Sequence, residues 1–550
     1  MHKPFEIGLV MAGAVSAGAY TGGVMDFLIQ ALDAWQKAKD AGEADAPRHE
    51  VRLKVMAGTS AGGMTAGIAC GALGSDFAPV TDPFQPDPAN KLFDSWVKRI
   101  DIAMLLGEAD LADENRPVRS LLDSSPLDAI ARDALDFKPR AEPRAWVSEP
   151  LHVLTTVSNL RGVPYNIPFR GDYREGHEMY AHADYVHFLV SVGGAATEAS
   201  ALSLDWARQT RIDNWRRLEN AALATGAFPV GLAPRALKLE RTLYDHRTWS
   251  IPAQGSPVGV GACSFIHTHR PIPAHWPESM RQHPDYATLC VDGGVMNNEP
   301  FDLARRIMLD GDCACPRGAE NATRAIVMVD PFPGADTDVG KYEAKDDVIS
   351  TFMSMFTAMK NQARFKPEDL ALAQEDDVYS RFLIAPTRDD ERHPIACGAL
   401  GGFSGFLSED FRRHDFMLGR RNCQAFLRKH FVLSAKHPLF ANWSEEQRNR
   451  FETIEDGQAF LPIIPLLDTA ESVCAVPEWP RYSGAQLDVL GEKIGNRYDT
   501  LMDRFAHQFA KDNWLARQAL KLFANRKKND AVNWACKRIQ TEFKVFKLMR

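Results

Sequence analysis

One short motif in this chain has the residue types and the spacing of a nucleophilic serine. Ser60 occupies the third position of G-x-S-x-G, which reads Gly58-Thr59-Ser60-Ala61-Gly62. An apolar run precedes the motif and small apolar residues follow it, as expected for a serine on a sharp turn between a strand and a helix. Glycines leave room where such a turn brings strand and helix together. The motif predicts acyl transfer through a covalent intermediate on Ser60.

A loop of small residues near the N-terminus could bind an anion. It follows an apolar run ending at Met11 and reads Gly13-Ala14-Val15-Ser16-Ala17-Gly18. Successive backbone N–H groups of such a loop can point at an oxyanion or at a nucleotide phosphate. The phosphate interpretation lacks its usual motifs, because the loop has no G-x-G-x-x-G and the chain has no G-x-x-x-x-G-K-[ST].

An aspartate much further along the chain could serve as the base. Asp292 ends an apolar run and is followed directly by Gly293 and Gly294. Asp-Gly-Gly also suits a tight hairpin turn, so the residues alone leave a turn and a catalytic carboxylate open. A further alternative is a Ser–Asp–His triad in the chain order of the α/β-hydrolases, with His393 or His414 as the base.

Together these pieces resemble the patatin-like phospholipases. That family has a glycine-rich oxyanion loop after its first strand, then a G-x-S-x-G elbow, and later a D-G-G or D-G-A that carries the catalytic aspartate. All three occur here in that order, and residues 222–234 are similar to the family's small-residue segment before the aspartate. The resemblance covers roughly residues 5–310. Residues 398–426 are similar to extended bacterial members with long helical C-termini.

The resemblance implies a serine lipid acyl hydrolase of the phospholipase A or esterase type. Ser60 is then the nucleophile and Asp292 its base, with no histidine between them. The implied oxyanion hole consists of the backbone N–H groups of Gly13, Ala14, Val15 and Ala61. The chemistry needs no metal ion and no organic cofactor, and the substrate is a lipid or another ester.

The glycine loop departs from the family pattern G-G-G-x-[KR]-G. Ala14 and Val15 replace two glycines, and Ala17 replaces the basic residue. Backbone N–H groups hold the oxyanion, so these residues can still supply donors, although β-branched Val15 resists a positive φ. A second hypothesis is therefore a lipid-binding or regulatory protein that keeps the fold without turnover.

The elements expected around these residues alternate between strands and helices. Apolar runs predict strands at 7–11, 51–57, 151–157, 288–291 and 325–329, and helical spacing predicts helices at 19–35 and 64–73. This alternation indicates an α/β fold with a mainly parallel sheet covered on both faces, which is the three-layer α/β/α sandwich that the resemblance implies. Residues 170–209 break the alternation and are expected to be an insertion. We expect a catalytic domain at 1–335 and a mostly helical region at 336–550.

Composition and charge exclude several classes of protein. With 45% hydrophobic residues and a net charge of -8, the chain has an ordinary globular composition and no basic character that would indicate nucleic acid binding. Nine irregularly spaced cysteines without a CxxC pair favour reduced thiols in the cytoplasm over a zinc site. His267 and His269 have no third ligand nearby in sequence. Neither a signal peptide nor a membrane-spanning run is found, so any membrane contact is expected to be peripheral.

The last forty residues carry the opposite charge from the rest of the chain. The segment Lys511–Arg550 contains eleven Lys or Arg against three Asp or Glu, a net charge of +8. Trp, Phe and Leu are interleaved with the basic residues at helical spacing. Such helices can lie on an anionic membrane, or they can pack on the core and expose a solvated basic face. Both interpretations stay open at this point.

Overall fold

The fold is built on one large mixed sheet. The computed structural model describes residues 3–168, 176–208, 212–252, 267–309, 316–334, 358, 362, 378–389, 391–510 and 514–549. The strand order is β11-β10-β1-β2-β3-β4-β5, with β9 paired to β3 and β6 paired to β9. Neighbouring strands from β11 to β3 are parallel, whereas β3 pairs antiparallel with both β4 and β9. The strands are β1 (Phe5–Met11), β2 (Val51–Gly58), β3 (Val147–Ile167), β4 (His177–Ser191), β5 (Leu202–Asp205), β6 (Arg235–Glu240), β9 (Asp285–Asp292), β10 (Arg324–Val329) and β11 (Arg381–Ile384).

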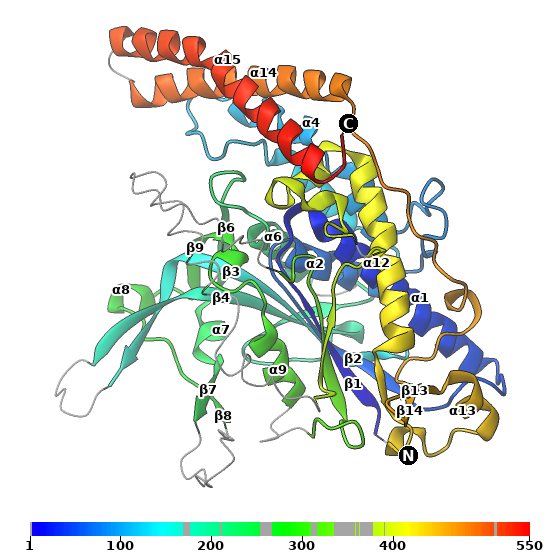
Figure 1. Cartoon of the computed structure of the whole chain (residues 1–550). Coiled ribbons are helices and arrows are strands. Elements are labelled where there is room, and N and C mark those ends of the chain that lie inside the picture. Colours follow the sequence, from blue (N-terminus) through cyan, green and yellow to red (C-terminus); the bar gives the residue numbers. More distant parts are fainter. Residues whose placement is uncertain are drawn as a thin grey trace, which may run out of the picture.

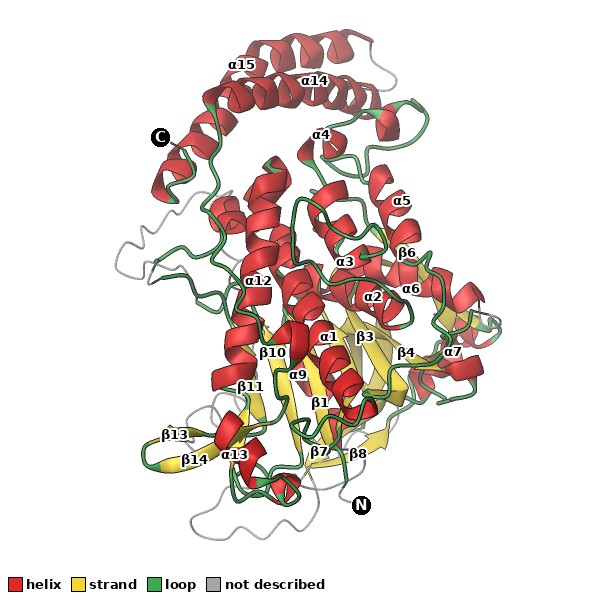
Figure 2. Ribbon diagram, turned by 90° about the vertical axis from the view of Figure 1, so that its right-hand side faces the viewer, coloured by secondary structure: helices red, strands yellow, loops and turns green. Residues whose placement is uncertain are grey.

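Helices cover both faces of this sheet, because its central strands are apolar on both sides. Along β1, Leu9 and Met11 pack into the larger core with α1 (Gly18–Asp40), and Val10 packs into a smaller core with α9 (Phe301–Leu309). Parallel strands buried on both faces read as continuous apolar runs for this reason. Figure 2 shows α1 and α12 (Glu409–Lys429) in front of the sheet. The mainly parallel sheet between helical layers confirms the predicted α/β fold.

The remaining elements surround this framework. The longer helices are α2 (Ala61–Leu73), α5 (Ser125–Ala134), α6 (Ile212–Thr225), α14 (Gly484–Phe509) and α15 (Trp514–Val545). The short helices are α3 (Lys91–Phe93), α4 (Ile102–Leu105), α7 (Arg241–Asp245), α8 (Glu278–Arg281) and α13 (Glu445–Phe451). Short 3-10 segments are η1 (Val15–Ala17), η3 (Ala109–Leu111), η4 (Val192–Gly194), η5 (Gly293–Val295), η7 (Ala396–Gly402), η8 (Ser404–Leu407), η9 (Pro438–Phe440) and η10 (Asp468–Ala470), and η2 (Asp94–Arg99) is a π-helix. Two small sheets contain β7 (Thr248–Pro252) with β8 (His267–Pro271), and β12 (Val432–Ser434) with β13 (Thr453–Glu455) and β14 (Gln458–Pro462).

The segment predicted as an insertion contributes to the main sheet instead. Residues 177–191 and 202–205 form β4 and β5, while residues 169–175 and 209 lie outside the described part of the chain. The first half of β4 is half-buried or exposed and only its second half is buried, so the segment has no continuous apolar run. An antiparallel hairpin of this kind gives a weaker signal than the buried parallel strands.

The C-terminal region packs tightly against the N-terminal half. Helix α12 lies against α1 so closely that a side chain at Gly23 would overlap the Phe416 carbonyl, and one at Gly419 would overlap the Tyr20 carbonyl. Helices α14 and α15 lie side by side and project from the body (Figure 1). Arg497 anchors α14, because its guanidinium contacts Asp110 and donates to the Gly107 and Leu121 carbonyls. The division at residue 335 falls outside the described residues and stays a prediction.

Candidate active site

Ser60 lies on the turn between β2 and α2, with a backbone conformation that serine rarely adopts. Its φ is 52° and its ψ is -126°. A side chain at Gly62 would overlap the Met11 carbonyl oxygen, and one at Gly58 would overlap the Gly62 carbonyl oxygen. The sequence places glycine where the turn brings strand, helix and β1 together. A strained turn of this kind presents the serine hydroxyl away from the sheet.

Asp292 meets Ser60 from the end of β9. The Ser60 Oγ donates a 2.6 Å hydrogen bond to Asp292 Oδ2, and the Gly294 N–H donates to Oδ1 at 2.7 Å. Both residues are nearly buried, with 8% of Ser60 and 6% of Asp292 exposed. The aspartate backbone is also fixed, because its N–H donates to the Ala227 carbonyl and its carbonyl accepts from Ser158 Oγ. The carboxylate is therefore held with one oxygen on the serine and the other on the backbone.

Three threonines support this pair, and no local pattern in the sequence predicts their contacts. The Ser60 N–H donates to Thr225 Oγ1 at 2.8 Å. Thr59 Oγ1 lies 2.6 Å from Thr156 Oγ1 and donates to the Asn297 carbonyl at 2.9 Å. Thr225 ends α6 inside the small-residue segment 222–234, so the family resemblance pointed to the segment without identifying the contact.

The glycine loop runs directly beside the serine. A β-carbon at Gly13 would lie 3.1 Å from Ser60 Cβ and 2.5 Å from Asn298 Oδ1, so this position requires glycine. The Gly13 N–H already donates a long 3.4 Å bond to the Asn298 carbonyl. Within the described residues, no acceptor is found for the backbone N–H groups of Ala14, Val15 or Ala61. Of the four expected oxyanion donors, these three N–H groups are therefore the most available to bind an oxyanion.

Val15 adopts the positive φ that its β-branched side chain resists. Its φ is 51°, a conformation that costs about 1–3 kcal/mol and needs external support. The support comes from η7 and η8: Ser16 Oγ donates to the Gly402 carbonyl and accepts a 3.0 Å hydrogen bond from the Gly405 N–H. A β-carbon on Gly402 would lie 3.2 Å from Val15 Cβ. The C-terminal region therefore supports the loop's shape although positions 14 and 15 are not glycine.

The histidines considered as alternative bases have other contacts. His414 is buried, with its Nδ1 2.7 Å from Asp415 Oδ1 and its ring against Trp479. His393 stacks on Phe546 at a ring-centroid distance of 4.1 Å. The bond between Ser60 and Asp292 is direct, with no imidazole between the two side chains.

One group of side chains has the spacing of metal ligands in the described part of the chain. Ligand atoms of His152, His187 and Glu198 lie within 4.8 Å of one another. Burial lowers the pKa of His187 well below its usual range, and the positive charges of Arg247 and Arg306 lower it further. The same charges oppose a bound cation, and the two rings already share a 3.0 Å hydrogen bond. The side chain of His267 lies outside the described residues, as do Cys313 and Cys315.

The arrangement has the parts needed for acyl transfer. A serine hydroxyl donates to a fixed carboxylate. The adjacent loop and the first turn of α2 supply backbone N–H groups that have no acceptor among the described residues. A helix N-terminus adds a positive dipole end where negative charge would develop. This combination matches the requirements for a nucleophile, a proton acceptor and an oxyanion hole.

Comparisons with known proteins agree with this geometry at the level of the family. A sequence model described as patatin-like phospholipase matches residues 9–305, more than half of the chain. An uncharacterized protein of Sinorhizobium fredii, y4iI, is 38% identical over 546 residues, which cover 90% of this chain and 75% of y4iI. The crystal structure of VipD from Legionella pneumophila aligns over 98% of this chain and 90% of VipD, at 12% identity and a TM-score of 0.23. A TM-score this low does not establish a common fold.

Proposed function

Because the chain belongs to the patatin-like phospholipase family, we propose that it is a serine lipid acyl hydrolase with a Ser60–Asp292 dyad. The observation that carries the proposal is the direct 2.6 Å hydrogen bond from Ser60 Oγ to Asp292 Oδ2. The bond joins residues 232 positions apart in the sequence, on a strained turn and at a strand end. Such convergence of a nucleophile and a base is typical of covalent catalysis.

The proposed reaction proceeds in two acyl-transfer steps. Ser60 Oγ attacks the ester carbonyl carbon while its proton passes to Asp292, and the protonated carboxyl then gives this proton to the departing alcohol. Water attacks the acyl-enzyme in the second step, gives its proton to Asp292, and the carboxyl returns a proton to Ser60 as the acid leaves. The N–H groups of Ala14, Val15 and Ala61 hold the carbonyl oxygen as it becomes negative, with a contribution from Gly13.

Labelling with a fluorophosphonate tests the nucleophile. The reagent phosphonylates an activated serine with loss of fluoride, so we expect wild-type protein to be labelled at Ser60 and Ser60→Ala to be unlabelled. His414→Gln and His393→Ala should label at rates within a few-fold of wild type, because the Ser60–Asp292 bond needs no imidazole.

Two outcomes would count against the dyad. Unlabelled wild-type protein would favour the lipid-binding or regulatory hypothesis. Loss of labelling in a folded His414→Gln variant would favour a triad instead. Circular dichroism and the thermal midpoint of each variant show whether the protein is folded.

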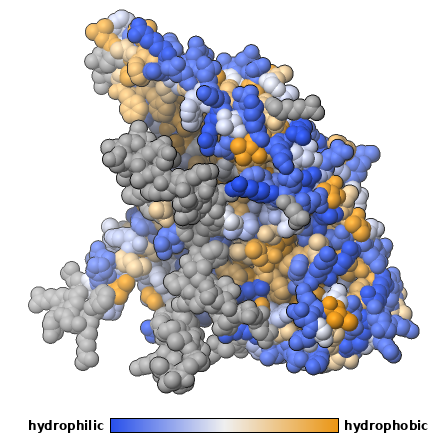
Figure 3. Space-filling model, in the orientation of Figure 1, coloured by the Kyte–Doolittle hydropathy of each residue, from blue (hydrophilic) through white to orange (hydrophobic). Residues whose placement is uncertain are grey.

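We also propose that α15 contributes to peripheral binding at an anionic membrane. The helix contains eight Lys or Arg residues and two Asp or Glu residues. Its first half exposes large apolar side chains, with Trp514, Leu515, Leu522 and Phe523 each more than 60% exposed. Apolar side chains are visible along the upper left of Figure 3, where the α14–α15 hairpin lies. Ile539 and Phe543, in the second half, are buried instead. The second half of the helix therefore packs on the protein, and the first half is free to contact a membrane.

Within the described residues, no helix is both long enough and apolar enough to cross a membrane. Lys511, Asp512 and Arg550 lie outside the described part of the basic segment. Exposed aromatic and basic side chains on one helix are suited to the interface between headgroups and acyl chains. Binding of the protein to anionic lipid should therefore depend on the charge of the helix and weaken as the salt concentration rises.

Vesicle co-sedimentation measures this binding. We expect full-length protein to bind vesicles of phosphatidylglycerol and phosphatidylcholine, and Arg526→Glu/Lys527→Glu/Lys528→Glu to bind about a hundredfold less, since each basic residue near an anionic leaflet contributes about 1 kcal/mol. The control is Arg216→Glu/Lys238→Glu/Lys436→Glu, which makes the same change of charge at exposed positions of the body. Equal binding by both triple variants, or binding that is indifferent to anionic lipid, would contradict the proposal.

A further inference from the structure

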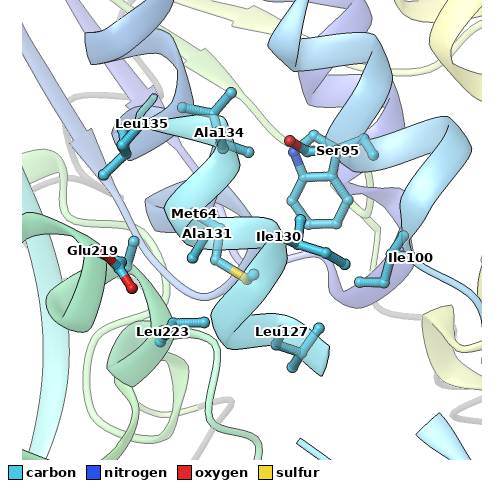
Figure 4. A pocket seen from close by; sticks show the side chains of 14 residues that line it. Met64, Ser95, Ile100, Leu127, Ile130, Ala131, Ala134, Leu135, Glu219 and Leu223 are labelled. Atoms are coloured by element: carbon cyan, nitrogen blue, oxygen red, sulfur yellow. The ribbon is translucent and has the colours of Figure 1, made fainter. Parts of the chain in front are cut away.

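The two sides of the expected oxyanion hole are supported in different ways. The Ala61 N–H belongs to α2, which is closely packed behind the nucleophile. Figure 4 shows side chains of α5 and α6 around Met64 of α2, and the apolar cavity between these helices holds only about 40 Å³. Ala14 and Val15 lie instead in the glycine loop between β1 and α1. The direction of their N–H groups therefore depends on the residues that hold this loop.

Residues 396–405, called the strap below, hold the glycine loop from the C-terminal region. Ser16 Oγ donates to the Gly402 carbonyl and accepts a 3.0 Å hydrogen bond from the Gly405 N–H. A β-carbon on Gly402 would lie 3.2 Å from Val15 Cβ, so the middle of the strap lies against the residue with the unfavourable φ. A displacement of Gly402 would remove this support, and Val15 would relax to a negative φ.

Helix α12 fixes the two ends of the strap. Asp415 accepts hydrogen bonds of 2.8 Å from the N–H groups of both Ala396 and Cys397 at the first end. Arg412 donates to the Gly405 carbonyl at 2.6 Å at the other end. Both charged side chains are almost fully buried, so the ends are held firmly. These bonds are made to the ends of the strap, and a different residue is bonded to its middle.

Glu542 of α15 binds the middle of the strap, where the backbone conformation needs support. Leu400, Gly401 and Gly402 follow one another with φ values of 57°, 63° and 95°. Glycine adopts such values readily, whereas leucine has to be held in them. Glu542 Oε2 accepts a 2.8 Å hydrogen bond from the Leu400 N–H. The negative charge of the carboxylate strengthens this bond.

We propose that Glu542 is a positioning residue for the oxyanion hole, acting through Leu400 and Gly402 on Val15. The inference rests on the proposed function, because the direction of the Val15 N–H affects catalysis only where an oxyanion forms beside Ser60. Without the carboxylate, Leu400 relaxes towards a negative φ, and Gly402 moves away from Val15. The Val15 backbone then relaxes in turn, and its N–H no longer points at the developing negative charge.

Steady-state kinetics of Glu542→Ala test this role. We expect kcat for p-nitrophenyl butyrate to fall at least about tenfold with KM changed less than about threefold, because oxyanion donors act in the transition state and loss of one lowers kcat about a hundredfold or more. Glu542→Gln should lose less than about threefold, because its amide oxygen still accepts from the Leu400 N–H although it no longer pairs with Arg538. Thr541→Ala is the matched control, an exposed neighbour on the same helix, and should leave kcat unchanged.

A second substitution acts on the strap itself. Asparagine adopts a positive φ more readily than leucine, so Leu400→Asn/Glu542→Ala should recover at least about threefold in kcat over Glu542→Ala. Glu542→Met keeps the length of the side chain without an acceptor for Leu400, and it replaces Glu542→Ala if the alanine variant does not fold. The thermal midpoint of each variant shows whether the protein is folded.

Hydrogen exchange measured by mass spectrometry separates this inference from the proposed function, because it needs no turnover. The Ala17 N–H donates to the Ala14 carbonyl and the Gly405 N–H donates to Ser16 Oγ, so peptides containing these amides report on the loop and the strap. In Glu542→Ala both amides should exchange at least about tenfold faster than in wild type, whereas peptides from α2 should not change.

Two outcomes would overturn the role of Glu542. One is unchanged exchange and unchanged kcat in Glu542→Ala. The other is an equal loss in Glu542→Gln and Glu542→Ala, which would assign the effect to the ion pair with Arg538 and not to the bond with Leu400. Faster exchange in a protein that a fluorophosphonate does not label would retain the control of the loop by Glu542 and reject the proposed acyl transfer.

Discussion

Ser60→Ala should abolish ester hydrolysis, with kcat lowered by about a thousandfold or more, as expected when a covalent nucleophile is removed. The substitution deletes the oxygen that donates to Asp292 and leaves the turn, its glycines and the Thr225 contact in place. We therefore expect a folded protein with a thermal midpoint near that of wild type. The loss of kcat is measured from the hydrolysis of p-nitrophenyl butyrate at several substrate and enzyme concentrations.

Asp292→Asn should have an effect of the same order. Asparagine can still accept the Gly294 N–H through its amide oxygen, but its amide cannot take the serine proton. Residues that act as one unit are strongly non-additive, so the double variant Ser60→Ala/Asp292→Asn should be little worse than either single variant. Asp285→Asn is the matched control, because Asp285 begins the same strand and pairs with exposed Lys238.

The dyad would be rejected by either of two results. One is wild-type turnover in Ser60→Ala. The other is a loss in the double variant equal to the product of the two single losses, since independent contributions multiply and a shared step does not. A loss of the same size in Asp285→Asn would indicate a change in the folding of β9 and not in catalysis.

The parts of the site that were predictable are those set by local sequence. Ser60 and its glycines form a motif because five residues must end the strand, begin the helix and expose the nucleophile. The apolar runs of β1, β2 and β10 identified buried parallel strands for a similar reason. Asp292 was ambiguous as a local pattern, and only the resemblance to a family distinguished a base from a turn.

The parts that were not predictable depend on residues far apart in the chain. The positive φ of Val15 is supported by contacts of Ser16 with residues 386 and 389 positions later, and no local pattern contains that information. Thr225 and Thr156 support the elbow from other elements in the same way. A sequence with fewer glycines than its family can therefore keep the loop's shape when a distant segment holds it.

A buried ion pair joins the two halves of the chain, and its disruption should have the largest effect on stability. Asp26 of α1 bonds to Arg420 of α12, and both are almost fully buried. The carboxylate also accepts from Asn90 Nδ2 at 2.6 Å and from the Val80 N–H at 3.1 Å. Asp26→Ala leaves Arg420 buried without its partner, which should cost about 3–5 kcal/mol, because removal of one member of a buried pair leaves an uncompensated charge. A lower apparent thermal midpoint measures the loss.

The control for this prediction is an exposed pair that spans the same halves of the chain. Asp45 pairs with Arg450, and both side chains are at least about one-third exposed, so Asp45→Ala should cost less than about 1 kcal/mol. Asp26→Leu/Arg420→Met should be less destabilising than Asp26→Ala, because it removes both charges from the interface together. If Asp26→Ala were no worse than Asp45→Ala, α12 would not depend on this pair for its position. If it is much worse, the buried pair contributes strongly to the position of α12 against α1, and the geometry of the glycine loop and the global stability should change together.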